Sequence, residues 1–319
     1  MRRTFIIAAL LSCLAPAFAA DYPNGVVRVI VPFAPGGTSD FVGRLTAQQL
    51  AEQMGASFVV ENRAGGSGVI GYSAVAKSQP TGQMLGIVEM GFSILPALSK
   101  TPAFDATKDF TPISLVMRTP MVLVVDPALK VNTLAEFMAM ARANPGKFNY
   151  GSAGVGSVNH LSGELFKRAA KVDVTHVPFK GGAGEVTMAM IGGQIQVFLT
   201  PAPSVLPHVK SGKLRALAIA SNKRDPSIPD VPTTAEAGLP GLEIYSWFGL
   251  VGPAGMTKDV VNKLQSEVAK AVAVPAVRAR FMAQGGEPVG SSSEEFAKLL
   301  DSEVRRWSEL VTSAGIKAD

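Results

Sequence analysis

Hydrophobic residues occur in short runs separated by longer segments of mixed polarity. The β-branched run at 26–31 predicts a buried strand, and the segment that follows predicts a helix over 41–54. Further strands are expected at 58–61 and 84–88, with a helix over 69–78 between them. Strands that alternate with helices in units of about thirty residues predict a parallel α/β sheet.

The same pattern returns in the middle of the chain. Thr133 and Glu136 have the spacing of a helix capping box, and a second box is expected at Ser292 and Glu295. Short strands are predicted at 122–125, 148–150, 175–177, 196–199 and 214–220, and further helices at 158–170, 257–274, 276–284 and 293–313. Two strand, Gly/Ser turn and helix units, at 26–54 and 148–170, predict two α/β lobes with ligands at the carboxyl ends of their strands.

The first residues have the pattern of a secretory signal. Arg2 and Arg3 precede an apolar run at 5–14, and Ala17 and Ala19 are small residues at the expected cleavage positions. The run of about ten residues is too short to span ~30 Å of hydrocarbon. We expect a signal peptide at 1–19 and an exported, soluble mature protein. A lipoprotein box at 10–13 is the less favoured alternative.

Composition narrows the function classes. With 319 residues, 47% of them hydrophobic and 17% charged, the chain has enough apolar residues for a large core. Loss of Arg2 and Arg3 lowers the formal charge from +5 to +3, and the remaining basic residues are scattered, so no nucleic acid partner is expected. The one cysteine, Cys13, lies in the signal segment. Without a Cys/His cluster, we expect no metal and no cofactor.

Two Gly/Ser-rich turns are the strongest candidates for a binding site. One contains Gly36, Gly37, Thr38 and Ser39, and the other spans 151–157; each precedes a predicted helix. Backbone N–H groups at a helix N-terminus are unpaired and carry partial positive charge, and glycine lets a ligand approach them closely. Each turn is therefore suited to hold a carboxylate. The alternative is that these residues only cap helices and form tight turns.

A second motif suggests a different function. Gly66, Gly68 and Gly71 match the dinucleotide pattern G-x-G-x-x-G, and Glu89 follows about twenty residues later. This favours a dinucleotide-dependent oxidoreductase as an alternative. Four residues separate Glu61 from Gly66, however, where the motif requires a glycine at the end of the strand. We therefore do not expect an enzyme.

The remaining candidate side chains do not define a reaction. His160, His176 and His208 lack the spacing of metal ligands, and no G-x-S-x-G nucleophile motif occurs. His160 either orients the second turn or contacts a ligand. The aromatic residues at 245, 247 and 248 belong to the core or line a cleft.

Four motifs give the mature chain a family resemblance. They are VPFAPGGTSD at 31–40, VENRAGG at 60–66, NYGSAGVGS at 149–157 followed by His160 and Leu161, and VPFKG at 177–181. In this order the chain resembles the Bug (TctC-like) solute-binding proteins of tripartite tricarboxylate transporters. The resemblance implies a type II periplasmic-binding-protein fold with lobe 1 formed by 20–120 and 246–319, lobe 2 by 121–245, and a two-segment hinge near 115–125 and 244–251.

The resemblance also implies a function. The protein would be a periplasmic monomer that captures a small carboxylate between its lobes and delivers it to membrane transporter subunits. An adaptor that presents the ligand to a signalling receptor is an alternative that would use the same cleft. The implied ligand-binding residues from the two turns are Phe33, Ala34, Gly36, Gly37, Thr38, Ser39, Asp40, Tyr150, Ser152, Ala153, Gly154, Ser157 and His160. Those from other segments are Gly91, Phe92, Pro178, Thr200 and Pro201.

One departure from the family pattern bears on the ligand. Many relatives place an acidic residue after the strand that begins near Gly193, and this chain has Thr200 there. A buried ammonium without an acidic partner is costly. We therefore expect a dicarboxylate or an aromatic acid rather than an amino acid.

Overall fold

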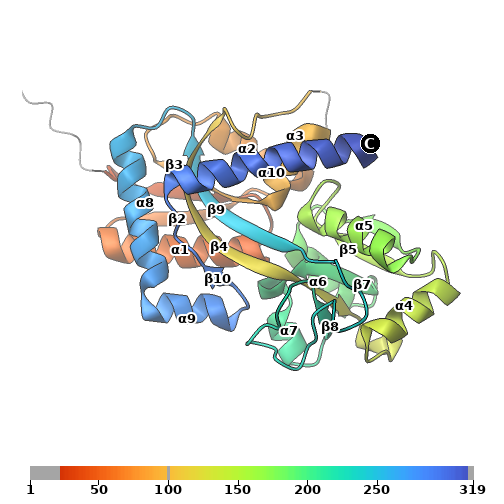
Figure 1. Ribbon diagram of the computed structural model, residues 1–319. Coiled ribbons are helices and arrows are strands. Elements are labelled where there is room, and N and C mark those ends of the chain that lie inside the picture. Colours follow the sequence, from red (N-terminus) through yellow and green to blue (C-terminus); the bar gives the residue numbers. More distant parts are fainter. Residues whose placement is uncertain (1–21, 99–100, 315–319) are drawn as a thin grey trace, which may run out of the picture.

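The computed structural model describes residues 22–98 and 101–314. The predicted signal peptide and Cys13 lie outside the described residues. Strands alternate with helices through the first two thirds of this part of the chain, and helices dominate the last third (Figure 1). The α/β class predicted from the hydrophobic pattern is confirmed.

One sheet runs through both halves of the molecule in the order β2-β1-β3-β9-β4-β7-β5-β6, and β8 and β10 pair with β4. Strands β1, β2 and β3 are parallel in one half and β5, β6 and β7 in the other, whereas β4 and β9 run antiparallel to their neighbours. The strands are β1 (Val27–Val31), β2 (Phe58–Asn62), β3 (Met84–Glu89), β4 (Phe110–Val125), β5 (Asn149–Ser152), β6 (Thr175–Pro178), β7 (Val197–Pro201), β8 (Arg215–Ile219), β9 (Tyr245–Pro253) and β10 (Glu287–Pro288).

Helices surround this sheet. Helices α8 and α9 lie with β1 to β3 in one half of the molecule, and α4 to α7 lie in the other half (Figure 1). The helices are α1 (Thr38–Met54), α2 (Val69–Ala76), α3 (Met90–Leu98), α4 (Leu134–Ala143), α5 (Val158–Ala170), α6 (Ala183–Ile191), α7 (Leu206–Lys210), α8 (Lys258–Ala273), α9 (Pro275–Ala283) and α10 (Ser293–Ala314). Short 3-10 turns are η1 (Gly66–Gly68), η2 (Pro127–Leu129) and η3 (Ala202–Ser204).

Strand β4 joins the two halves. Its residues up to Pro120 pair with β9, and its residues from Met121 pair with β7 and β8. Met121 also donates its N–H to the Ile244 carbonyl at the start of β9. The hydrophobic pattern alone predicted only 122–125, because Pro112, Arg118 and Pro120 interrupt the apolar run. The rest of this strand forms because β9, far along the chain, pairs with it.

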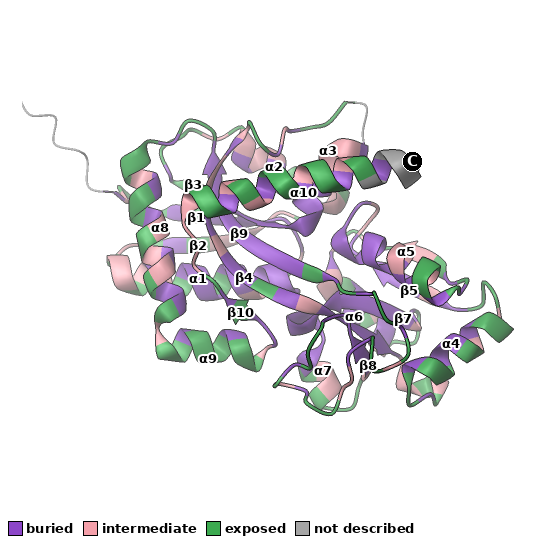
Figure 2. Ribbon diagram, viewed as in Figure 1, coloured by how far each residue is buried: buried purple, intermediate pink, exposed green. Residues whose placement is uncertain are grey.

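The core lies on both faces of the sheet. Along the second half of β4, Val122 and Val124 pack into one apolar cluster, and Leu123 and Val125 pack into another on the opposite face. This two-residue alternation is that of a strand buried on both sides. Strands β3, β4, β7 and β9 are buried along most of their length, and the outer faces of the surrounding helices are exposed (Figure 2). Packing of helices on both faces therefore fixes the sheet.

Local signals set several helix boundaries. Helix α5 begins and ends where the sequence predicted. Both capping boxes are confirmed: Thr133 and Glu136 bond reciprocally at α4, and Ser292 and Glu295 do so at α10. Helix α3, which contains Pro96 and is mostly apolar, was not predicted. Within the described ranges, no helix combines the length and apolar character that crossing a membrane requires.

Candidate binding site

A small cavity lies where the carboxyl ends of β1 and β5 approach each other. It leaves about 30 Å³ for the centres of water-sized molecules, more than the roughly 10–15 Å³ that one water needs. Its wall draws residues from both halves of the sheet. These residues are Phe33, Gly37, Thr38, Ser39, Glu89, Ala153, Ser157, Val158, Asn159, Ala183, Pro201, Ser204 and Phe248.

Three helices begin at the cavity. Helix α1 starts after Gly37, α5 after Ser157 and α6 after Gly182, and residues of all three first turns line the wall. The first N–H groups of a helix have no intrahelical acceptor and carry partial positive charge. The lining contains no Lys, Arg or His. Backbone dipoles and hydroxyls are thus the groups that favour an anion here.

The hydroxyl groups of the wall differ in the hydrogen bonds they already make within the protein. Thr38 donates its N–H to Ser204 Oγ over 3.1 Å, and the two side-chain oxygens lie 2.7 Å apart. Ser157 Oγ donates to the Gly154 carbonyl over 2.7 Å and caps α5 by accepting from the His160 N–H. The Ser39 hydroxyl has no hydrogen-bond partner among the described residues. Ser39 is therefore the hydroxyl of the first loop that remains available to a ligand.

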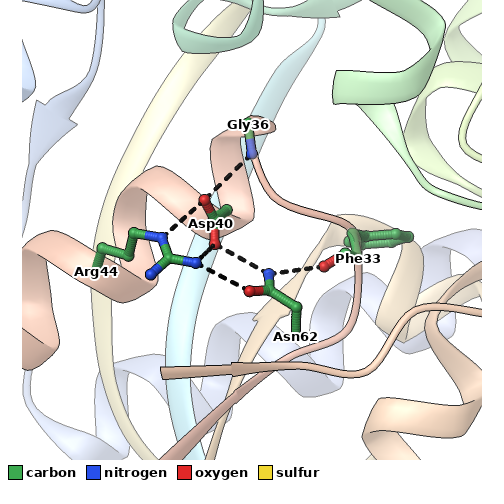
Figure 3. A network of polar contacts seen from close by, with 5 residues as sticks. All are labelled: Phe33, Gly36, Asp40, Arg44 and Asn62. Atoms are coloured by element: carbon green, nitrogen blue, oxygen red, sulfur yellow. Dashed lines mark hydrogen bonds and ion pairs between the residues drawn. The ribbon is translucent and has the colours of Figure 1, made fainter. Parts of the chain in front are cut away.

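Asp40 anchors the loop between β1 and α1, the first of the two Gly/Ser turns (Figure 3). Its Oδ2 accepts from the Gly36 N–H over 3.2 Å and from Arg44 Nε over 3.0 Å, and its Oδ1 accepts from Asn62 Nδ2 over 2.9 Å. Asn62 Nδ2 also donates to the Phe33 carbonyl. Burial opposes ionisation of Asp40, but these bonds together lower its pKa below the ordinary value. A charged Asp40 thus fixes the backbone that leads into α1.

A stack of rings supports the second loop. His160 Nδ1 accepts the Gly156 N–H over 3.2 Å, and the His160 ring stacks on His176 with centroids 4.3 Å apart. His176 Nε2 lies 2.6 Å from Ser152 Oγ, which accepts the Gly154 N–H. Burial, aided by His160, lowers the pKa of His176 to about 4. Both rings are neutral at physiological pH and position this loop.

The structure brings only part of the predicted set together at the cavity. Phe33, Gly37, Thr38, Ser39, Ala153, Ser157 and Pro201 line the wall. The others that support these loops are Gly36, Asp40, Ser152, Gly154 and His160, as described above.

The remaining predicted residues do not line the wall. Ala34 donates its N–H to the Gly181 carbonyl, and Tyr150 donates its hydroxyl to Glu164. Phe92, which follows Gly91 in α3, stacks on Phe104 in the core. Pro178 is exposed at the end of β6. Thr200 in β7 has a buried hydroxyl without a hydrogen-bond partner in the described structure.

Sequence reasoning missed several residues of the wall. Glu89 was considered only as part of a dinucleotide motif, yet it ends β3 at the cavity. Phe248 was one member of an aromatic group with no assigned place, and it lines the wall from β9. Val158, Asn159, Ala183 and Ser204 were not singled out. Their positions after strands or at helix starts were the available signal.

Direct contacts close the cavity. Besides the Thr38–Ser204 pair, Ser67 Oγ donates to the Val155 carbonyl over 2.7 Å. A side chain on Gly184 would place its Cβ 2.8 Å from the Pro35 carbonyl oxygen. These contacts join loops from opposite halves of the sheet and enclose the cavity. No group of three or more His, Cys, Asp or Glu in the described residues is arranged to hold a metal.

Two α/β halves joined by crossing strands, with an anion-favouring cavity between them, define a solute-binding protein. The chain belongs to the TctC family, the tripartite tricarboxylate transporter family receptors, which its residues 42–316 match. It is 35% identical to protein BugT of Bordetella pertussis over 314 residues, covering 98% of this chain and 96% of BugT. The family predicted from the four motifs is confirmed.

Two solved structures resemble this fold over nearly the whole chain. One is an R. palustris protein solved with adipate, with a TM-score of 0.89 and 35% identity, covering 93% of this chain and 99% of that one. The other is MatC from Rhodopseudomonas palustris with bound malate, with a TM-score of 0.85 and 34% identity, covering 91% and 100%. The type II periplasmic-binding-protein fold is thus confirmed, and the relatives are receptors for solutes rather than oxidoreductases.

Proposed function

We propose that this protein captures a small carboxylate between its two lobes and delivers it to a tripartite tricarboxylate-type membrane transporter. The observation that carries the proposal is the convergence of three helix N-termini, α1, α5 and α6, on one cavity without basic side chains. Such an arrangement suits an anion that must be bound and released. The adipate and malate found in the two relatives are ligands of this chemical class.

The lobes proposed for this capture are residues 20–120 with 246–319, and residues 121–245. Strands β4 and β9 pass between the halves and are the proposed hinge. Opening would separate Thr38 from Ser204 and Ser67 from Val155, whose bonds hold the closed form. Closure around the ligand is then the signal that the transporter recognises.

The site of action follows from the N-terminal pattern. Receptors of this family are periplasmic, and we propose that the chain is exported there with cleavage near Ala19. It would act as a monomer, with the transporter's membrane subunits as its protein partners.

A ligand screen by thermal shift tests the carboxylate proposal. Mature protein is mixed with mono-, di- and tricarboxylates, with the amides of the same skeletons and with NAD. A carboxylate at 100 times its dissociation constant is expected to stabilise the fold by about 2.7 kcal/mol, and its amide is expected to have no effect. Stabilisation by amides or NAD, but by no carboxylate, would reject the proposal.

A further inference from the structure

One wall residue has no place in the carboxylate site as described. Glu89 is the last residue of β3, is 2% exposed and lines the cavity. Its register partner on β9 is Phe248, another wall residue. A Cβ on Gly91 would contact Glu89 Oε1 and would lie 3.5 Å from the Ser157 Cα. The carboxyl group thus lies beside the cap of α5, at the junction of the two halves.

Among the described residues, this carboxyl group has no charged partner and no hydrogen bond of ordinary geometry. Neither of its oxygens is accessible to water. The cavity wall offers no cation. Buried carboxylates in folded proteins are normally paired, because removing the charge from water is costly. An unpaired acid at a ligand cavity is therefore a group whose partner the ligand would supply.

The cavity is consequently of mixed polarity. The N-termini of α1, α5 and α6 favour negative charge, and Glu89 favours a positive hydrogen-bond donor. In a plain dicarboxylate, the second carboxylate would bring another negative charge into a cavity that already holds Glu89 and has no basic side chain to balance it. A carboxylate that also carries an ammonium would satisfy both features.

Given the proposed receptor function, we infer that Glu89 is a specificity-determining residue that contacts a protonated nitrogen on the carboxylate ligand. This revises the expectation drawn from Thr200. That expectation assumed an acid must come from the strand β7 segment, and the acid at this cavity comes instead from β3 in the other half.

The proposal has a pH dependence with a definite sign. Burial raises the pKa of Glu89 to about 7, and the nearby Gly91 N–H offsets part of this effect. Tyr72 on α2 interacts with Glu89, and burial raises the pKa of Tyr72, so its hydroxyl stays neutral. On α5, burial lowers the pKa of His160, so its ring is neutral above pH 7. Helix α3 carries no titratable side chain, and the β9 neighbour is Phe248. Titration of Glu89 therefore governs ammonium binding between pH 5.5 and 8.

Matched probes test the inference by calorimetry on the mature protein. The pairs are succinate with aspartate, glutarate with glutamate, and adipate with 2-aminoadipate, each measured at pH 5.5 and 8. The tightest-binding probe is expected to be an aminated one, with an affinity about 30-fold higher at pH 8, because Glu89 must lose its proton to pair with the ammonium.

Two variants separate the role of Glu89 from general charge effects. Glu89→Gln is expected to lower the affinity for the aminated probe at least about tenfold at pH 8 and to remove the pH dependence of that affinity. Glu52→Gln, which replaces an exposed acid on α1, is expected to change neither the affinity for the aminated probe nor its pH dependence. The melting temperature of ligand-free Glu89→Gln shows whether the variant folds, and it is expected to equal or exceed that of the wild type at pH 8.

The outcomes distinguish this inference from the receptor proposal. If plain dicarboxylates bind the wild type more tightly than their aminated partners, and bind better at pH 5.5, the receptor proposal stands and the role given to Glu89 is wrong. If Glu89→Gln binds the aminated probe as well as the wild type does, that role is also wrong. If no probe of any pair binds while another carboxylate of the thermal-shift screen stabilises the fold, the role given to Glu89 is wrong and the receptor proposal stands.

Discussion

At the scale of single residues, the cavity separates groups that hold the closed form from groups left for a ligand. Thr38 and Ser204 bond each other, and Ser157 is committed to the second loop. Ser39 follows Thr38 in the first turn of α1 and its hydroxyl has no partner among the described residues. We therefore propose different roles for these two adjacent hydroxyls, closure for Thr38 and ligand binding for Ser39.

Replacement of Ser39 by alanine tests this division. A hydrogen bond to a charged group contributes about 1.5–3 kcal/mol, so Ser39→Ala is expected to weaken binding of the best carboxylate probe about tenfold or more. The melting temperature without ligand is expected to stay unchanged, since no protein bond is lost. Ser302→Ala, on the exposed face of α10, is the matched control. Unchanged affinity in Ser39→Ala, measured by calorimetry, would place the carboxylate elsewhere.

Glu89 also predicts how the ligand-free protein responds to pH. Burial raises its pKa from the ordinary 4.5 to about 7, so the folded chain binds this proton more tightly than the unfolded chain does. The resulting stability is fully present below pH 4.5 and is lost as the pH rises through 7. Relative to Glu89→Gln, the wild type is expected to lose up to about 3 kcal/mol between pH 4.5 and 8 in urea unfolding. A difference between the two proteins that does not vary with pH would contradict this.

At the scale of elements, the start of α6 must approach the first loop closely. Gly184 lies in the first turn of this helix, and its backbone faces Pro35 and Gly37 of the other half. Even a methyl group would be 2.8 Å from the Pro35 carbonyl oxygen and 3.2 Å from the Gly37 nitrogen. The loops meet only because this position has no side chain.

Gly184→Ala is therefore expected to hinder closure. Crowding of this kind costs about 1–3 kcal/mol, so carboxylate affinity is expected to fall about tenfold, and small-angle X-ray scattering should show less compaction on ligand addition. Gly192→Ala, at the other end of α6, meets only ordinary contacts of 3.5 Å or more and serves as the control. Equal compaction in both variants would show that this contact does not limit closure.

Elements also show what the sequence could predict. The boundaries of α5 and the capping boxes depend on neighbours within a few residues, and the sequence predicted them. The first part of β4 and the burial of Glu89 depend on β9, which pairs with both β4 and β3 from more than a hundred residues away. The two Gly/Ser turns were recognisable as local motifs. The acid that faces them was visible only once β3 was placed between β1 and β9.

At the scale of the whole molecule, the distribution of basic side chains would suggest a different binding site for a carboxylate. Two grooves of about 640 and 650 Å³ lie beside the crossing strands β4 and β9, and the first is lined by Arg118, Lys210, Lys223, Arg224 and Arg278. The enclosed cavity is much smaller and has no basic side chain. We propose the cavity as the receptor site nevertheless, because three helix N-termini converge there beside the unpaired hydroxyl of Ser39.

A crystal structure of the mature protein with the carboxylate probe that stabilises it most tests this directly. The proposed function predicts the carboxylate beside Ser39 and the first turns of α1 and α5, enclosed by both lobes. Density for the probe in the groove that contains Arg118 and Arg278, with the cavity free of it, would contradict the central claim.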